Sequence, residues 1–261
     1  MKNFNYHSAK DSKDASKLAS SNSAFLAGGM TTIPSMKLGL ATYKDLIDIK
    51  NIKKLNGIKV SAKSVIIGAT TKHVEVANSK DIKKSIPSLS SLAEGIGDPQ
   101  VRNRGTIGGS IANNDPSADY PSACIALNAI IHTNERKIEA SKFFKGMFET
   151  ALKKGELIES IEFEIPEKSS YQKHPNPASR YAIVGVYVAK YKEEVNVAIT
   201  GAKSCVYNDK DISKALKGSF SSSSIDGMEL NSSEMNSDIH ASAEFRASLI
   251  VTQAKKAVEA C

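Results

Sequence analysis

Residues 98–121 constrain this chain more than any other stretch. The segment reads DPQVRNRGTIGGSIANNDPSADYP and combines repeated glycine and proline with two arginines, three aspartates and three asparagines. Only the short piece from Thr106 to Ala112 is apolar in character. Glycine and proline interrupt regular structure, and loops often carry binding residues. We therefore expect an exposed loop that binds a ligand.

A second glycine pair suggests what that ligand carries. Gly28-Gly29 follows the apolar run from Ala24 to Ala27, a predicted strand, much as Gly108-Gly109 follows an apolar residue. Backbone N–H groups at such turns can bind an anion, and the missing Cβ permits close approach. Two such turns suit the two phosphates of a diphosphate. A tight structural turn explains Gly28-Gly29 equally well.

Other classes of site are disfavoured. Neither glycine pair has the G-x-G-x-x-G or G-x-x-x-x-G-K-[ST] spacing, which argues against a nicotinamide Rossmann site and a P-loop. The three cysteines are far apart and form no C-x-x-C pair, so no disulfide framework, zinc site or iron–sulfur site is expected. The five scattered histidines are interpreted as surface or core residues rather than ligands: His7, His73, His132, His174 and His240.

Composition indicates an ordinary globular chain. Of the 261 residues, 41% are hydrophobic and 24% are charged, which is enough for a core and two or three subdomains. The net charge of +7 comes from scattered lysines, which favours solvated surfaces over nucleic-acid binding. No apolar run approaches the roughly 20 residues of a membrane span, and the start has no apolar signal region. A cytoplasmic protein with reduced thiols is expected.

The residue pattern predicts alternating helices and strands. Strands are expected at 24–27, 46–49, 65–67, 129–133, 137–139, 157–165, 181–188 and 195–202, and helices after Thr31 or Thr32, after Thr70 or Thr71, and at 82–93, 118–127 and 241–260. The terminal helix is expected to present Phe245 and Leu249 on its apolar side. Residues 167–179 are expected to form an irregular domain boundary, and residues 219–224 a mobile loop.

Several motifs resemble one protein family. Residues 27–34, AGGMTTIP, look like the first pyrophosphate loop of the FAD-binding medium subunit of molybdenum hydroxylases, and residues 98–112 and 114–121 look like the second. The similarity continues in the family's order through 143–146, 157–161, 180–185 and 241–246. It covers nearly the whole chain and is greatest to subunits of the aerobic carbon monoxide dehydrogenase type, within the xanthine dehydrogenase family.

The resemblance implies an α+β fold and a division of labour between subunits. Two subdomains, 1–56 and 57–167, would form a FAD-binding fold of the vanillyl-alcohol-oxidase/PCMH type, followed by a C-terminal antiparallel sheet-plus-helix domain, 168–261. FAD would be bound non-covalently, since the first loop carries no histidine. A large subunit would hold the molybdenum cofactor and a small subunit [2Fe-2S] clusters, in a dimer of heterotrimers. Quinone or NAD would accept the electrons. Carbon monoxide, an aldehyde, a purine and an N-heterocycle all remain open as substrates.

The resemblance also assigns residues to FAD, with no catalytic or metal-binding residue in this chain. The pyrophosphate would be wrapped by Ala27, Gly28, Gly29, Met30, Thr31, Thr32, Thr106, Gly108, Gly109 and Ser110. Ala112 and Asn113 would lie along the cofactor, Asp119 would bind sugar or ribityl hydroxyls, and Leu157 or Ile158 would lie near a ring edge. Lys173 and Tyr181 match positions beside the isoalloxazine.

Alternatives stand beside these assignments. Asp119 could be only a helix-terminus carboxylate, Tyr181 could pack in a strand, and Arg102 and Arg104 could anchor the loop or contact a partner. The whole chain could be a flavin-free scaffold subunit. A stand-alone flavin oxidase is disfavoured because no substrate-side acid or base stands out.

Overall fold

The computed structural model describes residues 1–261 as an α+β protein built on three main sheets. The first sheet is parallel, with strand order β1-β3-β2. Its unit contains β1 (Asn5–Ser8), α1 (Ser12–Leu18), β2 (Ser23–Leu26), α2 (Thr32–Lys37), β3 (Asp45–Asp48) and the 3-10 turn η1 (Lys53–Leu55). Asp11 begins α1 because its carboxylate accepts the Asp14 amide at 2.8 Å.

The second sheet is antiparallel, with order β4-β5-β10-β6-β7. Ile161 lies opposite Ile67 on one side and Ile131 on the other, and all three are fully buried. This unit contains β4 (Ile58–Val60), β5 (Ser64–Gly68), α3 (His73–Asn78), α4 (Lys80–Ser85), α5 (Pro87–Glu94), α6 (Pro99–Arg104), α7 (Ile107–Asn113), α8 (Tyr120–Ala126), β6 (Ile130–Thr133), β7 (Lys137–Glu139), α9 (Ala140–Phe143), β8 (Phe144–Gly146), β9 (Glu149–Thr150) and β10 (Ile158–Glu164).

The third sheet is antiparallel, with order β11-β12-β13-β14, and is covered by the terminal helix. This unit contains β11 (Lys168–Pro175), β12 (Ala182–Lys190), β13 (Val195–Thr200), β14 (Tyr207–Asn208), α10 (Lys210–Gly218), η2 (Ser222–Ile225) and α11 (Ala243–Glu259). Buried Arg246 on α11 donates to the carbonyls of Ile183 (2.6 Å) and Gly201 (3.0 Å) and pairs with Asp238. The helix is thereby bonded to the sheet as well as packed on it.

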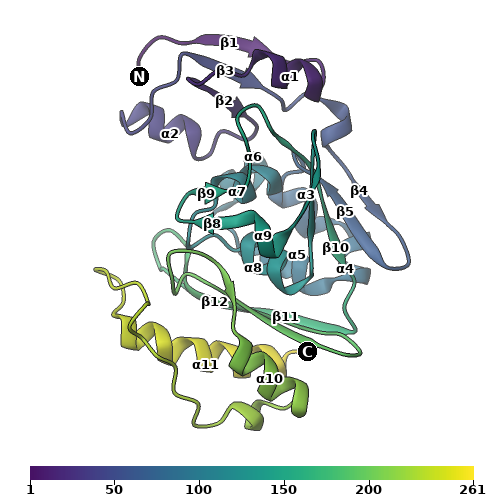
Figure 1. The fold of residues 1–261 in the computed structure, drawn as a ribbon, viewed down its shortest axis with the longest axis vertical. Helices are drawn as coiled ribbons and strands as arrows, with labels where there is room; N and C mark the ends of the chain where they lie inside the picture. The colour runs from purple at the N-terminus through teal and green to yellow at the C-terminus, as the bar shows by residue number, and fades with distance from the viewer.

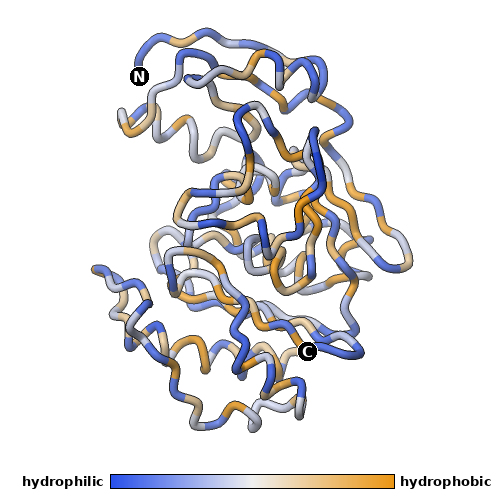
Figure 2. The backbone as a smooth tube through the Cα atoms, in the orientation of Figure 1, coloured by the Kyte–Doolittle hydropathy of each residue, from blue (hydrophilic) through white to orange (hydrophobic).

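The three units are stacked along the long axis of the molecule (Figure 1). The first sheet and the N-terminus lie at one end, and α10 and α11 lie at the other. Apolar stretches follow the strands of the middle unit, while the outer turns are largely hydrophilic (Figure 2). No helix combines the length and the apolar character that a membrane crossing requires.

Most predicted elements are confirmed, and the exceptions are informative. Residues 98–121 are not a loop, since α6, α7 and the start of α8 occupy most of them. Helix α3 begins after Lys72 rather than at Thr70 or Thr71, and Thr71 instead hydrogen-bonds Gly57. Residues 168–175 form the edge strand β11, because backbone pairing with β12 organises a polar sequence that shows no alternation.

Two C-terminal expectations are also corrected. Residues 222–225 form the 3-10 turn η2, which is anchored by fully buried Ile225, instead of a featureless mobile loop. Phe245 is 46% exposed, whereas Leu249 is buried as expected. The buried face of α11 instead includes Arg246, because its guanidinium faces the sheet and donates to the Ile183 carbonyl.

Two glycines allow close backbone contacts, Gly28 between the first and second units and Gly108 within the second unit. A Cβ built on Gly28 would lie 2.1 Å from the Arg104 carbonyl oxygen, at the end of α6. A Cβ on Gly108 would lie 2.5 Å from the Ala69 Cβ and 2.7 Å from the Ala69 carbonyl oxygen, just past β5. The glycines are therefore required by packing within the chain.

Gly108→Ala is expected to destabilise the protein by about 2 kcal/mol or more, since overpacking a rigid backbone contact costs roughly 1–3 kcal/mol. Gly218→Ala is the matched control, because a Cβ there meets nothing within 4 Å. Urea unfolding of both variants measures the difference. Equal midpoints for the two variants would contradict this account of Gly108.

Candidate functional site

A cavity of about 450 Å³ lies where the units meet. It is lined from the first unit by residues 28–32, from the second by α6, α7 and the segment 156–158, and from the third by residues 179–181. The structure brings the following sequence-predicted residues to its wall: Gly28, Gly29, Met30, Thr31, Thr32, Thr106, Gly108, Gly109, Ser110, Ala112, Asn113, Asp119, Leu157, Ile158 and Tyr181. Ala27 and Lys173 do not line it.

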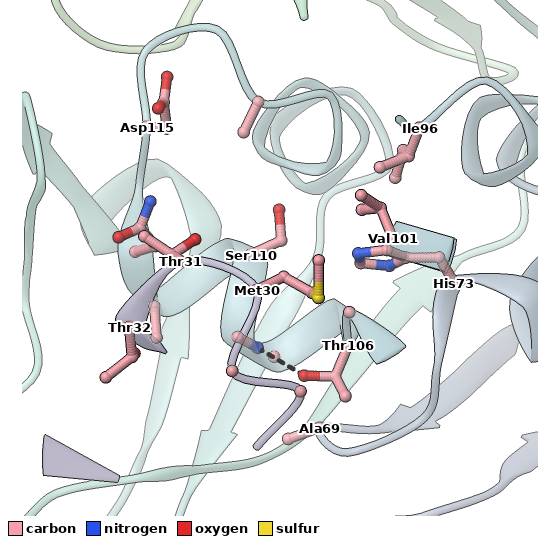
Figure 3. Close-up of a pocket in the computed structure, with 18 of the residues that line it drawn as sticks. Met30, Thr31, Thr32, Ala69, His73, Ile96, Val101, Thr106, Ser110 and Asp115 are labelled. Atoms are coloured by element: carbon pink, nitrogen blue, oxygen red, sulfur yellow. Dashed lines mark hydrogen bonds between the residues drawn. The ribbon is translucent and has the colours of Figure 1, made fainter. Parts of the chain in front are cut away.

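The first loop offers a row of free backbone donors. None of the amides from Gly28 to Thr32 donates a hydrogen bond to any acceptor in the chain. Ile33 is the first amide that is used, and it donates to the Gly29 carbonyl at 3.1 Å. Gly28, Gly29 and Thr32 are half-buried, where amides are normally paired, whereas Met30 and Thr31 are exposed. Five consecutive free donors beside a cavity can bind an acceptor-rich ligand. Figure 3 shows Met30, Thr31 and Thr32 along one side of this cavity.

The second glycine pair has a different role from the predicted one. Gly108 donates to the Ala69 carbonyl at 2.9 Å, and Gly109 donates to the Thr106 hydroxyl at 3.2 Å, the dashed line in Figure 3. The expectation that this pair presents free N–H groups is therefore wrong. The Ser110 hydroxyl has no partner in the chain and lies at the cavity, so it is the donor that α7 keeps available.

Asp119 is held by the third sheet and caps nothing. Its side chain makes no capping hydrogen bond to α8, so the purely helix-terminal interpretation is wrong. Its carboxylate instead accepts from the Tyr171 hydroxyl and lies 3.1 Å from the Lys173 ammonium. Burial raises the pKa of Asp119, while Lys173 and Tyr171 oppose that rise. The remaining lone pairs of this carboxylate can accept from a ligand hydroxyl in the cavity.

Lys173 does not line the cavity but hydrogen-bonds to residues in or next to its lining. Its ammonium donates to the Gly95 carbonyl (3.0 Å), to Asp119 (3.1 Å) and to the Arg180 carbonyl (2.9 Å). All three protons of the ammonium are thus used inside the chain. Lys173 joins α5, α8 and the turn before β12, and it positions the wall of the cavity from behind.

Tyr181 and Asp115 both line the cavity. Tyr181 is 44% exposed and precedes β12, so it does not pack within the strand. Burial raises the pKa of Asp115, and burial followed by the charges of Asp115 and Asp119 raises that of Tyr181. Arg180, with a φ of 62°, donates to the Gly97 carbonyl at 3.2 Å and fixes the turn that presents Tyr181.

Arg102 is an anchor for the segment that leads into α6. Its guanidinium donates to the carbonyls of Ile96 (3.0 Å) and Gly97 (2.9 Å). Arg104 contributes its carbonyl to the contact with Gly28, and its side chain is exposed. Of the two arginines, Arg102 therefore has the structural role that was considered for it.

The lining of the cavity also includes apolar side chains and one buried carboxylate. Phe25, Ile49 and Leu157 contribute apolar surface there. The side chain of Glu156 is fully buried, and its carboxylate forms a salt bridge with the Arg136 guanidinium at 2.9 Å. Arg136 and the Thr133 hydroxyl hold the pKa of Glu156 below its usual value against the effect of burial. These apolar side chains suit a flat, weakly polar ring better than a phosphate.

His73 is a lining residue that sequence reasoning missed. The imidazole is 4% exposed, and its Nδ1 has no hydrogen-bond partner. Burial, assisted by the charge of Arg102, lowers the pKa of His73 from 6.5 to about 4. The sequence around this histidine, at the start of a predicted helix, does not indicate a binding role, because only tertiary packing brings the side chain to the cavity. The other missed lining residues are Phe25, Ile49, Ala69, Ile96, Gly97, Val101, Gly105, Asp115, Ala118, Leu152, Glu156, Ser179 and Arg180.

The low pKa of His73 predicts a pH-dependent stability. In the unfolded chain His73 is protonated near pH 6.5, but in the folded protein only near pH 4. Its contribution to the free energy of unfolding is therefore fully present above pH 6.5 and is lost as the pH falls toward 4. At about 1.36 kcal/mol per pKa unit, this amounts to about 3 kcal/mol. Unfolding free energies measured from pH 7 to 4 should fall more steeply for the ligand-free wild type than for His73→Phe. Parallel curves would contradict the prediction.

Comparisons with known proteins identify the family of this chain. Residues 2–167 match the family described as FAD binding domain in molybdopterin dehydrogenase. The glyceraldehyde dehydrogenase medium chain of Sulfolobus acidocaldarius is 35% identical over 228 residues, which cover 82% of this chain and 81% of that relative. The carbon monoxide dehydrogenase medium chain of Hydrogenophaga pseudoflava is 30% identical over 278 residues, with coverages of 98% and 96%.

A solved structure extends the similarity to the whole fold. A chain of reconstituted CO dehydrogenase from Oligotropha carboxidovorans superposes with a TM-score of 0.91 at 28% identity. The match covers 99% of this chain and 97% of the other. The free amides at residues 28–32 are chemically suited to the diphosphate of FAD, and the apolar lining residues are suited to one of its rings. The chain belongs to the FAD-binding medium subunits of the molybdenum hydroxylases, and it is an oxidoreductase subunit.

Proposed function

We propose that this chain is the electron-transfer subunit of a molybdenum hydroxylase complex of the aerobic carbon monoxide dehydrogenase type. It takes electrons from [2Fe-2S] clusters on a small partner subunit and passes them to an external acceptor such as quinone or NAD. A large partner subunit carries the molybdenum cofactor, and the complex is a cytoplasmic dimer of heterotrimers. The observation that carries the proposal is the row of free amides from Gly28 to Thr32 beside the cavity.

Different residues of the cavity bind different parts of FAD. The amides of residues 28–32 donate to the diphosphate, and charge-assisted hydrogen bonds of this kind contribute about 1.5–3 kcal/mol each. The unpaired Ser110 hydroxyl adds a further donor from α7. Asp119, held by Lys173 and Tyr171, accepts from a sugar or ribityl hydroxyl. Apolar side chains such as Leu157 pack against a ring.

The chain positions the cofactor and supplies no proton-transfer machinery of its own. When bound, FAD provides the two-electron oxidation and reduction chemistry, as cofactors of this kind do. All three donors of the Lys173 ammonium are used in contacts within the chain. The first loop carries no histidine, so the flavin is held non-covalently. We assign residues 1–56 and 57–167 as the two cofactor-binding subdomains and residues 168–261 as the closing domain.

Met30→Glu tests the diphosphate assignment. Met30 lies on the free-amide loop and lines the cavity, so a carboxylate there repels the bound phosphates. We expect FAD affinity to fall at least about tenfold, which corresponds to about 1.4 kcal/mol. Titration of the deflavinated full chain, followed by flavin fluorescence, measures the dissociation constant.

Leu38→Glu is the matched control. Leu38 follows α2, is 74% exposed and does not line the cavity, so the same change of charge should leave FAD affinity unchanged. Thermal melts check that both variants fold. If Met30→Glu binds FAD as tightly as Leu38→Glu does, the diphosphate does not lie at this loop. Isolation of the flavin-loaded chain with a molybdenum subunit and an iron–sulfur subunit tests the proposed complex.

A further inference from the structure

His73 lies next to the free-amide loop, residues 28–32, although it comes from a different unit. It is the first residue of α3, and its amide donates to the Gly105 carbonyl at 3.0 Å. A Cβ on Gly105 would lie 2.5 Å from the His73 Nε2, and a Cβ on Gly28 would lie 2.9 Å from the Gly105 Cα. A single glycine therefore separates the imidazole from the loop.

The imidazole faces the cavity with an unmet hydrogen-bonding need. Neither ring nitrogen of His73 has a hydrogen-bond partner in the chain, and Nδ1 is wholly shielded by protein. In Figure 3 the ring lies beside Val101 with its nitrogen-bearing end toward Met30. Nε2 is not shielded in this way and belongs to a residue that lines the cavity, so it can bond to a partner that the chain does not supply.

The protonation state of His73 suits a donor rather than a cation. Burial and the neighbouring Arg102 lower its pKa to about 4, so the imidazole is neutral at pH 7 and carries one N–H. In a neutral imidazole the second nitrogen carries a lone pair and no proton. A buried lone pair without a partner is better tolerated than a buried N–H without one. One donor is thus available for an acceptor in the cavity.

We propose that His73 is a further ligand-binding residue, which donates one hydrogen bond from its imidazole to an oxygen of the phosphate-bearing chain of FAD. The inference rests on the proposed function and adds a side-chain donor to the backbone donors of residues 28–32. It also explains why Gly105 is a glycine, because any side chain there would occupy the position of the imidazole.

The competing explanation is that His73 only packs against Tyr120. The two rings lie 5.4 Å apart, and the Tyr120 hydroxyl is another buried atom without a partner. Tyr120 does not line the cavity, however. Tyr120→Phe is therefore a matched control, since it removes an unpaired buried polar atom from the same cluster without removing a donor from the cavity.

The test measures FAD binding and ligand-free stability separately on the full deflavinated chain. His73→Phe should weaken FAD binding by about tenfold, as expected for the loss of one hydrogen bond to a charged group, while its ligand-free melting temperature stays equal or rises. His73→Gln, which retains a donor near Nε2, should bind within about threefold of wild type. Tyr120→Phe should bind as wild type does.

Each other outcome overturns the inference. Wild-type affinity in His73→Phe shows that the ring makes no bond to FAD, and equal losses of stability and affinity in both His73 variants show a purely structural role. If neither variant folds, ¹⁵N-histidine NMR of the wild type decides, because unchanged His73 nitrogen shifts on adding FAD exclude the bond. A wild-type chain that takes no FAD overturns the proposed function as well, whereas tight wild-type binding with no effect at His73 overturns this inference alone.

Discussion

Direct contact between backbones holds this molecule together around its cavity. Gly28 rests on the carbonyl of Arg104, and Gly108 rests on Ala69, at distances that no side chain could share. The first contact joins the parallel sheet to α6, and the second fixes α7 against the end of β5. Because both contacts border the cavity, its shape is set by main-chain geometry. Rigid walls of this kind suit a ligand that must be held in one orientation.

This packing explains an asymmetry between two similar sequence motifs. The amides of Gly108 and Gly109 are used inside the protein, whereas those of residues 28–32 remain free. Both motifs contain a glycine pair after an apolar residue, so local sequence alone predicts the same role for both. The difference arises because the carbonyl of Ala69 and the hydroxyl of Thr106 reach the second pair. Only the tertiary fold determines which donors are left for a ligand.

Sequence reasoning was most reliable where a local pattern has one physical meaning. The apolar strands β5, β10, β12 and β13 were predicted because their burial requires apolar residues, and nearly all the motif residues do line the cavity. The failures share one cause. Strand β11 is polar and depends on β12 for its pairing, and His73 reaches the cavity only because Gly105 leaves room for its ring. Such features depend on contacts between residues distant in sequence, which periodicity does not encode.

The three hydrogen bonds of Lys173 have a consequence for the order of biosynthesis. This ammonium, on the first strand of the third sheet, ties together Gly95, Asp119 and the turn that presents Tyr181. A nascent chain that ends at residue 167 already contains the free-amide loop but lacks this tie and the wall formed by residues 179–181. Its Asp119 would lack both Tyr171 and Lys173, the partners of its carboxylate. The lining of the cavity is therefore complete only after the third unit has been synthesised.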